Sequence, residues 1–162
     1  MSKQHHYALK ITWTGNRGTG TNHYTSYDRS HTVEAPNKIP IYASSDAPFL
    51  GDVSKHNPED FLLASLASCH MLWYLHLCAD AGVIVLSYID HPNGILIQND
   101  SGGGSFSEVT LNPKVTISDA NLINKALELH QLANKKCFIA NSVNFPVKHF
   151  PDIIVQENLN KV

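Results

Sequence analysis

Charge is scarce in this chain. Only 16% of its 162 residues are Asp, Glu, Lys or Arg, and the formal net charge is −2. This balance provides no basic surface for nucleic acid and no cationic stretch for an anionic membrane, so we expect neither partner. The first ten residues also lack the apolar segment of a signal peptide, and no run approaches the ~20 apolar residues of a membrane span. We therefore expect a cytoplasmic protein.

Cysteine is equally scarce, with three residues at positions 69, 78 and 137. An odd count without a secretion signal argues against a structural disulfide framework. The ten histidines form no H-x-x-x-H pair and the cysteines form no C-x-x-C pair, so no metal site is expected. Any disulfide in the cytoplasm should be transient and functional.

The order of apolar patterns predicts a single α+β domain over residues 1–162. Glycine- and proline-rich turns separate the predicted strands, which favours hairpins over alternating β-α units. We expect an antiparallel sheet packed with two long helices. The predicted strands are 7–13, 24–33, 39–43, 83–97, 106–117 and a last one within 141–156, and the predicted helices are 58–79 and 120–136.

The first predicted helix has clear boundaries. Asn57 is suited to the N-cap, Pro58 to the first helical position and Glu59 to the positive end of the helix dipole, while Gly82 is suited to the C-cap. The helix is apolar almost all round, which is typical of a buried helix. In a chain of this size, that pattern indicates a central helix at an oligomer interface.

Cys69 lies inside this helix, and the chemistry of its thiol depends on a nearby cation. A reactive cysteine is a thiolate stabilised by positive charge, and Cys69 is too far from the helix N-terminus for the dipole to act. There is no Lys or Arg between residues 57 and 112, so the cation must come from elsewhere. Arg17, in a glycine-rich loop, is the first candidate and Arg29 the alternative. Glu59 is suited to hold the guanidinium by a bidentate pair.

Taken together, these residues resemble the OsmC/Ohr family of thiol-dependent peroxidases, which act on organic hydroperoxides. The resemblance rests on Asn-Pro-Glu opening a buried helix, Ala-Ser-Cys-His within it, Ala-Gly-Val after it, and a second cysteine at the end of the late helix. It covers nearly the whole chain. It implies an intertwined homodimer with the site at the subunit interface. One departure is Phe138, which stands where family members often have proline.

The resemblance also implies the site. Cys69 matches the peroxidatic thiol, Cys137 the resolving thiol, Arg17 the activating cation and Glu59 the acid that holds it. Cys69 would form a sulfenic acid, and Cys137 would convert it to a disulfide that an external dithiol or a lipoylated protein reduces, with no other cofactor. Candidate residues for an apolar substrate wall are Phe61, Leu62, Trp73 and Phe138.

Simpler interpretations of the same residues remain open. The two cysteines could be packed core thiols, Glu59 could serve only the helix dipole, and Arg17 could be a solvated loop charge. We interpret Cys78 as a core residue, since it lies half a turn around the helix from Cys69, and we expect His70 to make a core hydrogen bond or to line the site. The alternative function is a non-catalytic protein of this fold that binds an apolar small molecule at the dimer interface.

Overall fold

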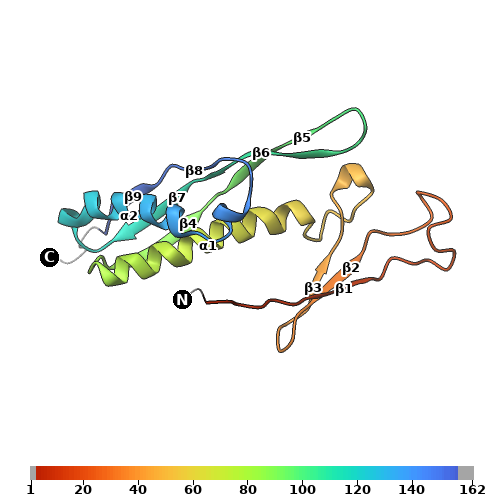
Figure 1. Cartoon of the computed structure of the whole chain (residues 1–162), viewed down its shortest axis with the longest axis horizontal. Coiled ribbons are helices and arrows are strands. Elements are labelled where there is room, and N and C mark those ends of the chain that lie inside the picture. Colours follow the sequence, from red (N-terminus) through yellow and green to blue (C-terminus); the bar gives the residue numbers. More distant parts are fainter. Residues whose placement is uncertain (1–2, 157–162) are drawn as a thin grey trace, which may run out of the picture. The chain divides into compact units, whose positions relative to one another are not determined.

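The computed structural model describes residues 3–156, which divide into two units, 3–61 and 62–156. The boundary falls in the first turn of helix α1. The prediction of one domain over the whole chain is not tested by this division. The elements are shown in Figure 1. Their bounds are β1 (Lys10–Trp13), β2 (His31–Glu34), β3 (Ile41–Ala43), η1 (Ala47–Phe49), α1 (Pro58–Asp80), β4 (Val85–Asp90), β5 (Asn93–Gln98), β6 (Gly104–Leu111), β7 (Pro113–Ile117), η2 (Ala120–Leu122), α2 (Ile123–Lys136), η3 (Ala140–Ser142), β8 (Val147–His149) and β9 (Asp152–Val155).

The first unit contains a small antiparallel sheet with strand order β1-β2-β3. Its strands are shorter than the three predicted ranges; β1 and β3 fall inside theirs, and β2 ends one residue beyond its range, at Glu34. The prediction of a strand over 24–33 is wrong for residues 24–30, which form turns and a loop before β2 begins at His31. The side chains of Arg17 and Arg29 donate hydrogen bonds to backbone carbonyls within residues 24–27. A strand would need these carbonyls for pairing with its neighbour.

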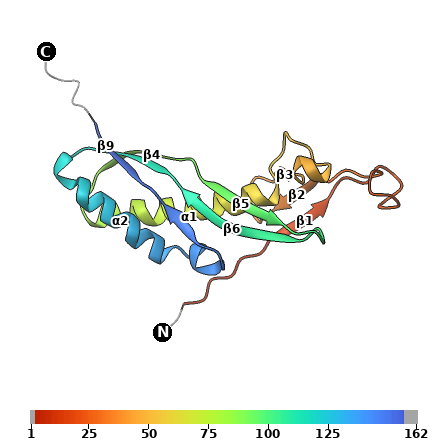
Figure 2. The same ribbon diagram turned by 90° about the horizontal axis from the view of Figure 1, so that it is seen from above.

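In the second unit the strands form two three-stranded sheets, β4-β7-β9 and β5-β6-β8. The expectation of purely antiparallel pairing is wrong: β7 pairs with β9 in parallel, and so does β6 with β8. The reason lies in the chain path. After α2 the chain returns as β8 and β9, which run in the same direction as β6 and β7. Figure 2 shows the β5–β6 hairpin and the last strands from above.

Each long strand predicted here is instead two short strands in sequence. Proline has no N–H for the ladder, and Pro92, Pro113 and Pro151 stand at the three breaks. The register nevertheless continues across them, because Asp90 faces Pro113 and Asn93 faces Thr110. The Asp90 carboxylate accepts a 2.7 Å hydrogen bond from the N–H of Asn112, which pins two of the breaks together.

Helix α1 begins and ends as predicted. Asn57 caps it by accepting a 2.8 Å bond from the N–H of Asp60, whose carboxylate accepts from the N–H of Asn57 in return. At the other end Gly82 adopts a φ of +72°, and the N–H of Val83 donates to the carbonyl of Cys78 at 2.9 Å. This left-handed residue with a six-residue closing bond is a Schellman-type C-cap.

Only one face of α1 is buried by the chain itself. The buried residues are Leu66, His70, Tyr74, Leu77 and Cys78, and they recur every three to four positions. The prediction for Cys78 is therefore confirmed: it is a core residue. The expectation of burial on every side is not met within this chain, since Leu72 remains 63% exposed.

By length and composition α1 could cross a membrane, and it is the one such helix among residues 3–156. The expectation that no run approaches a span was therefore too strong. The core helix of a globular protein meets the same criteria. Here the buried face of α1 carries His70 and Tyr74 and packs into the two core clusters described next.

Helices α1 and α2 pack together on the sheet β4-β7-β9, and α1 also packs on β6 (Figure 1). Their buried stripes meet in one core cluster. It comprises Tyr74, Leu77, Cys78, Val83, Val115, Ile117, Ala126, Leu129 and Ala133, and a smaller cluster comprises Leu66, Val109 and Leu111. In α2 the apolar residues Leu127 and Leu132 are partly exposed, and the histidine His130 is buried on the stripe.

A group of histidines lies at the contact between the two helices. His70 Nε2 of α1 is 3.0 Å from His130 Nδ1 of α2, and the ring of Tyr74 stacks on His130 at 3.7 Å. His149 of β8 lies 5.4 Å from His70, centroid to centroid. His70 and His130 are fully buried. Burial lowers the pKa of His70 to about 4 and that of His130 to about 3, so both are neutral at pH 7.

The C-cap of α1 gives the first prediction. Replacing Gly82 by Ala should destabilise the protein by about 1 kcal/mol, because an L-residue with a Cβ is strained at positive φ. No atom lies within 4 Å of the position that the Cβ would take, so crowding adds nothing. Urea unfolding followed by circular dichroism measures the difference. Gly82→Asn is the control and should cost less, since Asn tolerates this conformation; equal losses in both variants would contradict the explanation.

The neutral histidines give the second prediction. In the unfolded chain each takes up a proton near pH 6.5, whereas in the folded chain each does so only near pH 4 or below. The free energy of unfolding should therefore be unaffected by these two histidines above pH 6.5. It should fall by about 2 kcal/mol or more between pH 6.5 and 4.5. Urea unfolding across this range measures the slope.

A matched pair of variants assigns that slope to the buried group. His70→Gln removes one of the two groups and should flatten the pH dependence. His76→Gln, on an exposed position of the same helix, should leave it unchanged. An unaltered slope in His70→Gln would show that other groups cause the acid sensitivity.

Candidate active site

The second unit brings Cys69 and Cys137 together. Cys69 is half-buried in the middle of α1, and Cys137 is the C-cap of α2 with 1% of its surface exposed. The Cys137 thiol lies close enough to the Cys69 side chain to interact with it, and it accepts a hydrogen bond from the N–H of Ala140, 3.4 Å from its sulfur. Both cysteines, like Cys78, are free thiols in this structure. The two sulfurs that the sequence singled out thus lie in mutual reach.

The two thiols have different surroundings. Burial raises the pKa of Cys137 to about 11, and the interaction with Cys69 contributes to the rise, while the backbone N–H groups of Ala140 and Ile139 oppose it. Cys137 therefore keeps its proton at neutral pH. Cys69 is the more accessible sulfur, and the buried Cys137 thiol is its neighbour. Cys69 is therefore the accessible sulfur of the pair and Cys137 the buried one.

The chain beyond α2 is folded tightly around Cys137. The N–H of Asn141 donates to the Cys137 carbonyl at 3.0 Å, and the Asn141 side chain donates to the carbonyl of Lys135 at 3.0 Å. The hydroxyl of Ser142 donates to the carbonyl of Phe138 at 2.7 Å. These bonds hold the turn into η3 and fix the direction of the Cys137 side chain.

Two of the four predicted wall residues lie beside the thiols. Trp73 is one turn after Cys69 on α1, and its ring meets that of Phe138 edge to face at 5.7 Å. The ammonium of Lys136 lies 5.3 Å from the centre of the Trp73 ring. Of the other two, Leu62 packs on the smaller core cluster and Phe61 lies near His56 in the first unit. Lys136, a cation directly before Cys137, was not singled out by the sequence reasoning.

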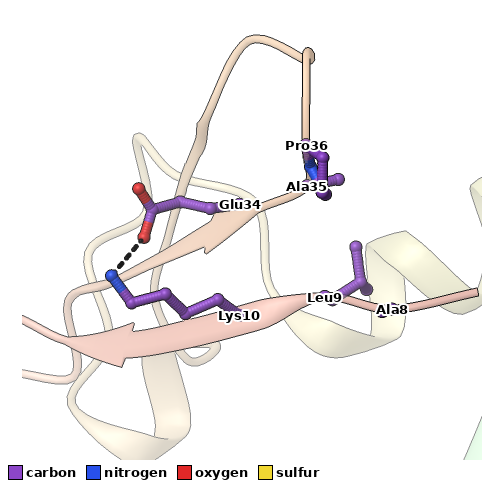
Figure 3. Close-up of a pocket in the computed structure, with 6 residues that line it drawn as sticks. All are labelled: Ala8, Leu9, Lys10, Glu34, Ala35 and Pro36. Carbon is purple, nitrogen blue, oxygen red and sulfur yellow. Dashed lines mark ion pairs between the residues drawn. The ribbon is translucent and has the colours of Figure 1, made fainter.

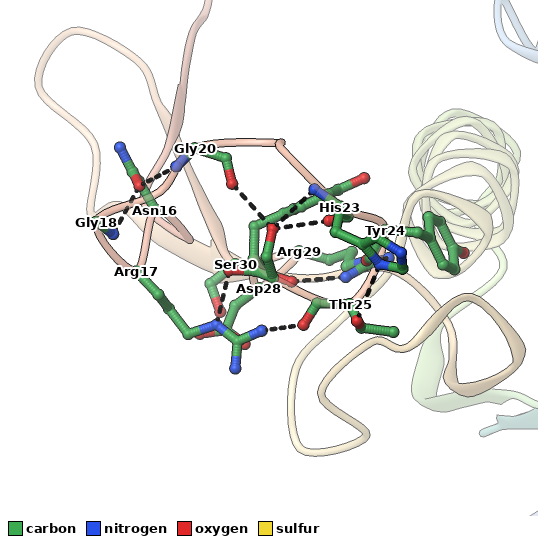
Figure 4. A network of polar contacts seen from close by, with 12 residues as sticks. Asn16, Arg17, Gly18, Gly20, His23, Tyr24, Thr25, Asp28, Arg29 and Ser30 are labelled. Carbon is green, nitrogen blue, oxygen red and sulfur yellow. Dashed lines mark hydrogen bonds and ion pairs between the residues drawn. The ribbon is translucent and has the colours of Figure 1, made fainter.

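Arg17 lies in the first unit, in a loop that its neighbours hold in shape (Figure 4). Its guanidinium donates to the carbonyls of Ser26 (3.2 Å) and Thr25, and it lies 3.8 Å from the Asp28 carboxylate. Gly15 is required nearby, because a Cβ there would collide with the Asp28 carbonyl. The Arg17 side chain stays about half exposed (51%), which leaves it available for a further partner.

Arg29, the alternative candidate, is held more completely. Its guanidinium lies 4.3 Å from the ring centres of both Tyr24 and Tyr27 and donates to the carbonyls of the same two residues at 2.7 and 2.6 Å. These contacts give Arg29 a structural role in the loop. Of the two arginines, Arg17 is the better candidate for an activating cation.

Glu59 lies half-buried in the first turn of α1 and forms no ion pair among residues 3–156. Its predicted contact with Arg17 is not formed within the first unit. There the Arg17 guanidinium lies beside the carboxylate of Asp28 instead. Both residues belong to the first unit and both cysteines to the second. The roles of Arg17 and Glu59 therefore stay predictions.

Two hollows in the surface of the described residues are lined by neither Cys69 nor Cys137. One of about 410 Å³ in the first unit is lined by Ala8, Leu9, Lys10, Glu34, Ala35 and Pro36, and its only ionic feature is the 3.4 Å pair between Lys10 and Glu34 (Figure 3). It offers no nucleophile. Within residues 3–156 no cluster of three or more His, Cys, Asp or Glu side chains is arranged to hold a metal ion.

The sequence reasoning found His70 but missed its partners. Its core hydrogen bond is confirmed by His130. The signal for His130 was present, since it lies on the stripe of Ala126, Leu129 and Ala133 at helical spacing. His149 alternates with the exposed Lys148 in β8, which also marked it as inward-facing.

The family model for OsmC-like proteins matches residues 51–149, more than half of the chain. No curated protein matches. A solved OsmC-like protein of unknown function from Vibrio cholerae O1 biovar eltor is 32% identical, with a TM-score of 0.79 over 91% of this chain and 99% of its own.

Two solved organic hydroperoxide resistance proteins share the fold at lower identity. The one from Elizabethkingia anophelis is 16% identical, with a TM-score of 0.65 over 95% of this chain and all of its own. The one from Legionella pneumophila is 15% identical, with a TM-score of 0.64 over 94% and 98%. With the family model and the Vibrio structure in agreement, the resemblance seen in the sequence is confirmed: this chain belongs to the OsmC-like protein family.

Proposed function

We propose that this protein is a thiol-dependent peroxidase that reduces organic hydroperoxides to alcohols. The observation that carries the proposal is the pairing of an accessible thiol, Cys69, with a buried and protonated one, Cys137. Relatives of the same fold that are named organic hydroperoxide resistance proteins support the substrate class.

The first step is nucleophilic attack. The Cys69 thiolate attacks the outer oxygen of the hydroperoxide, the O–O bond breaks, and the alkoxide leaves and takes up a proton to become the alcohol. The sulfur is oxidised to a sulfenic acid and the peroxide is reduced. Trp73 and Phe138 form an apolar wall beside the sulfur, which suits a substrate with a hydrocarbon group.

The second step restores the enzyme. Cys137 attacks the sulfenic sulfur, a disulfide forms and water leaves. An external dithiol or a lipoylated protein then reduces this disulfide by thiol–disulfide exchange and is itself oxidised. The proximity of Cys137 to Cys69 supports this step. No metal or organic cofactor takes part in this scheme.

Arg17 and Glu59 complete the proposed site. A guanidinium favours the thiolate over the thiol, and a carboxylate fixes its orientation. Arg17 fits this role because half of its side chain is exposed, whereas Arg29 is held between two tyrosines. Lys136 adds a second positive charge beside the apolar wall.

The proposed function is that of a homodimer in the cytoplasm. Its exposed apolar side chains include Leu72 of α1 and three consecutive residues of β5, Ile95 to Ile97. Exposed apolar side chains are typical of a protein–protein interface, and a second copy of the chain would cover the faces of α1 that this copy leaves open. A cytoplasmic setting keeps all three thiols reduced between turnovers.

The third prediction tests the reaction. With cumene hydroperoxide and a dithiol, the wild-type protein should produce cumyl alcohol over many turnovers, and Cys69→Ser should produce none. Cys137→Ser should form the first equivalent of alcohol and then turn over more slowly than wild type with the same dithiol, because its sulfenic acid has no internal partner and must wait for the external thiol. Cys78→Ser is the matched control and should behave as wild type.

Gas chromatography of the alcohol and mass spectrometry of the oxidised protein provide the measurement. A wild-type protein that binds the hydroperoxide without turnover would favour the alternative, a non-catalytic protein that binds an apolar small molecule. A bridge from Cys69 to Cys78 in the oxidised protein would contradict the assignment of Cys137.

The fourth prediction concerns the activating cation. Arg17→Gln should slow the formation of alcohol by at least about tenfold at pH 7, because a charge-assisted hydrogen bond to an anion contributes about 1.5–3 kcal/mol. Arg17→Lys keeps the charge and should recover part of the rate. Stopped-flow measurement of the first turnover isolates this step from resolution.

Arg29→Gln separates activation from loop structure. It removes the cation between the two tyrosines, so its effect should appear in thermal stability more than in the first-turnover rate. A larger rate loss in Arg29→Gln than in Arg17→Gln, with folding intact, would exchange the two assignments.

A further inference from the structure

A hydrogen bond between two buried histidines links the helices that carry the thiols. His70 directly follows Cys69 on α1, and His130 lies seven residues, about two turns, before Cys137 on α2. Their ring nitrogens are 3.0 Å apart, and the ring planes are within 11° of parallel. Both side chains are fully buried. The reaction proposed above uses neither of them.

The pair is fixed on every side. Tyr74 of α1 stacks on His130 with 3.7 Å between ring centres, Tyr88 of β4 lies 6.4 Å from it, and His149 of β8 lies 5.4 Å from His70. The remaining nitrogens, Nδ1 of His70 and Nε2 of His130, have no partner among residues 3–156. The hydrogen bond between the two rings is therefore the one polar contact of each ring among the described residues.

We propose that His70 and His130 are positioning residues that hold α1 and α2 in the register at which Cys137 reaches Cys69. This proposal rests on the proposed peroxidase function and concerns its second step, the formation of the disulfide. The bond specifies one pairing of nitrogens, Nε2 with Nδ1, and so resists a sliding of one helix along the other.

Disulfide formation makes this register important. A bond between two sulfurs requires Cβ atoms about 3.8 Å apart and a narrow range of dihedral angles. A slip of one residue along a helix moves a side chain by about 1.5 Å and turns it by about 100°. Apolar contacts alone tolerate small displacements, whereas a hydrogen bond between two rings is directional.

The first step places no such demand on α2. Attack of Cys69 on a peroxide needs an accessible thiolate and a cation, and neither His70 nor His130 contacts the peroxide in this scheme. Loss of the histidine pair should therefore separate the two steps: attack continues while resolution slows. A role in general stability alone would not produce that separation.

The experiment compares His70→Leu and His130→Leu with wild type in a single turnover. Reduced protein receives one equivalent of cumene hydroperoxide, and samples are quenched over time. The alcohol should form at the wild-type rate, while the Cys69–Cys137 disulfide, measured by mass spectrometry, should form at least tenfold more slowly. The sulfenic acid should accumulate and be trapped at Cys69 by dimedone.

Conservative variants give the matched controls. Gln at position 70 and Asn at position 130 carry an amide near the place of the bonding nitrogen, so His70→Gln and His130→Asn should restore the rate of disulfide formation. His130→Gln displaces the amide by one methylene and should restore less, and it serves as the test variant where a Leu variant fails to fold. His91→Leu, on an exposed position outside both helices, should leave both steps unchanged.

An arm with diamide distinguishes the two proposals. Diamide oxidises a pair of thiols to a disulfide and is itself reduced to the hydrazine, so it reports the register of the thiols without any peroxidase activity. Slow disulfide formation in the Leu variants with both oxidants supports the positioning role. Wild-type rates with both oxidants in folded Leu variants overturn it and leave the peroxidase intact. A wild-type protein that forms no alcohol overturns the peroxidase, and the diamide arm still decides the role of the histidines.

Discussion

The packing of α1 on α2 is the contact on which the rest of this molecule depends. Each helix contributes one buried stripe, and the two stripes meet over the sheet β4-β7-β9. The same contact brings Cys69 to Cys137 and His70 to His130. Stability and chemistry are therefore not separate layers of this fold. The side chains that fill the core also set the distance across which a disulfide would form.

The sequence predicted what is local. Asn57, Pro58 and Gly82 bound the first helix because caps depend on a few adjacent residues, and Cys69 and Cys137 were found because their surroundings are motifs. It failed where distant segments decide. Parallel pairing of β8 and β9 depends on the return path of the chain, and burial of His130 depends on the partner helix. The roles of Arg17 and Glu59 stay predictions, because both residues belong to the first unit and the cysteines to the second.

The two thiols show how one fold gives unlike properties to one residue type. Cys137 is buried at the end of a helix and keeps its proton, which suits a group that waits for an oxidised partner. Cys69 is open to a reagent and lies beside an aromatic wall. Cys78, on the same helix as Cys69, is enclosed in the core and has no redox partner among the described residues. Position around a helix decides which sulfur can react.

The break between β4 and β5 lies opposite the break between β6 and β7, and this limits where the chain can gain residues. Since Asp90 with Pro113 and Asn93 with Thr110 follow one register, the two halves of the ribbon are mechanically one ladder. Inserting a single residue at Pro92 would shift the register of β5 against β6 by one residue. The tip at residues 99–103 lies outside the ladder, where Asn99 accepts the local N–H bonds. Growth of this hairpin is thus confined to its far end, away from the thiols.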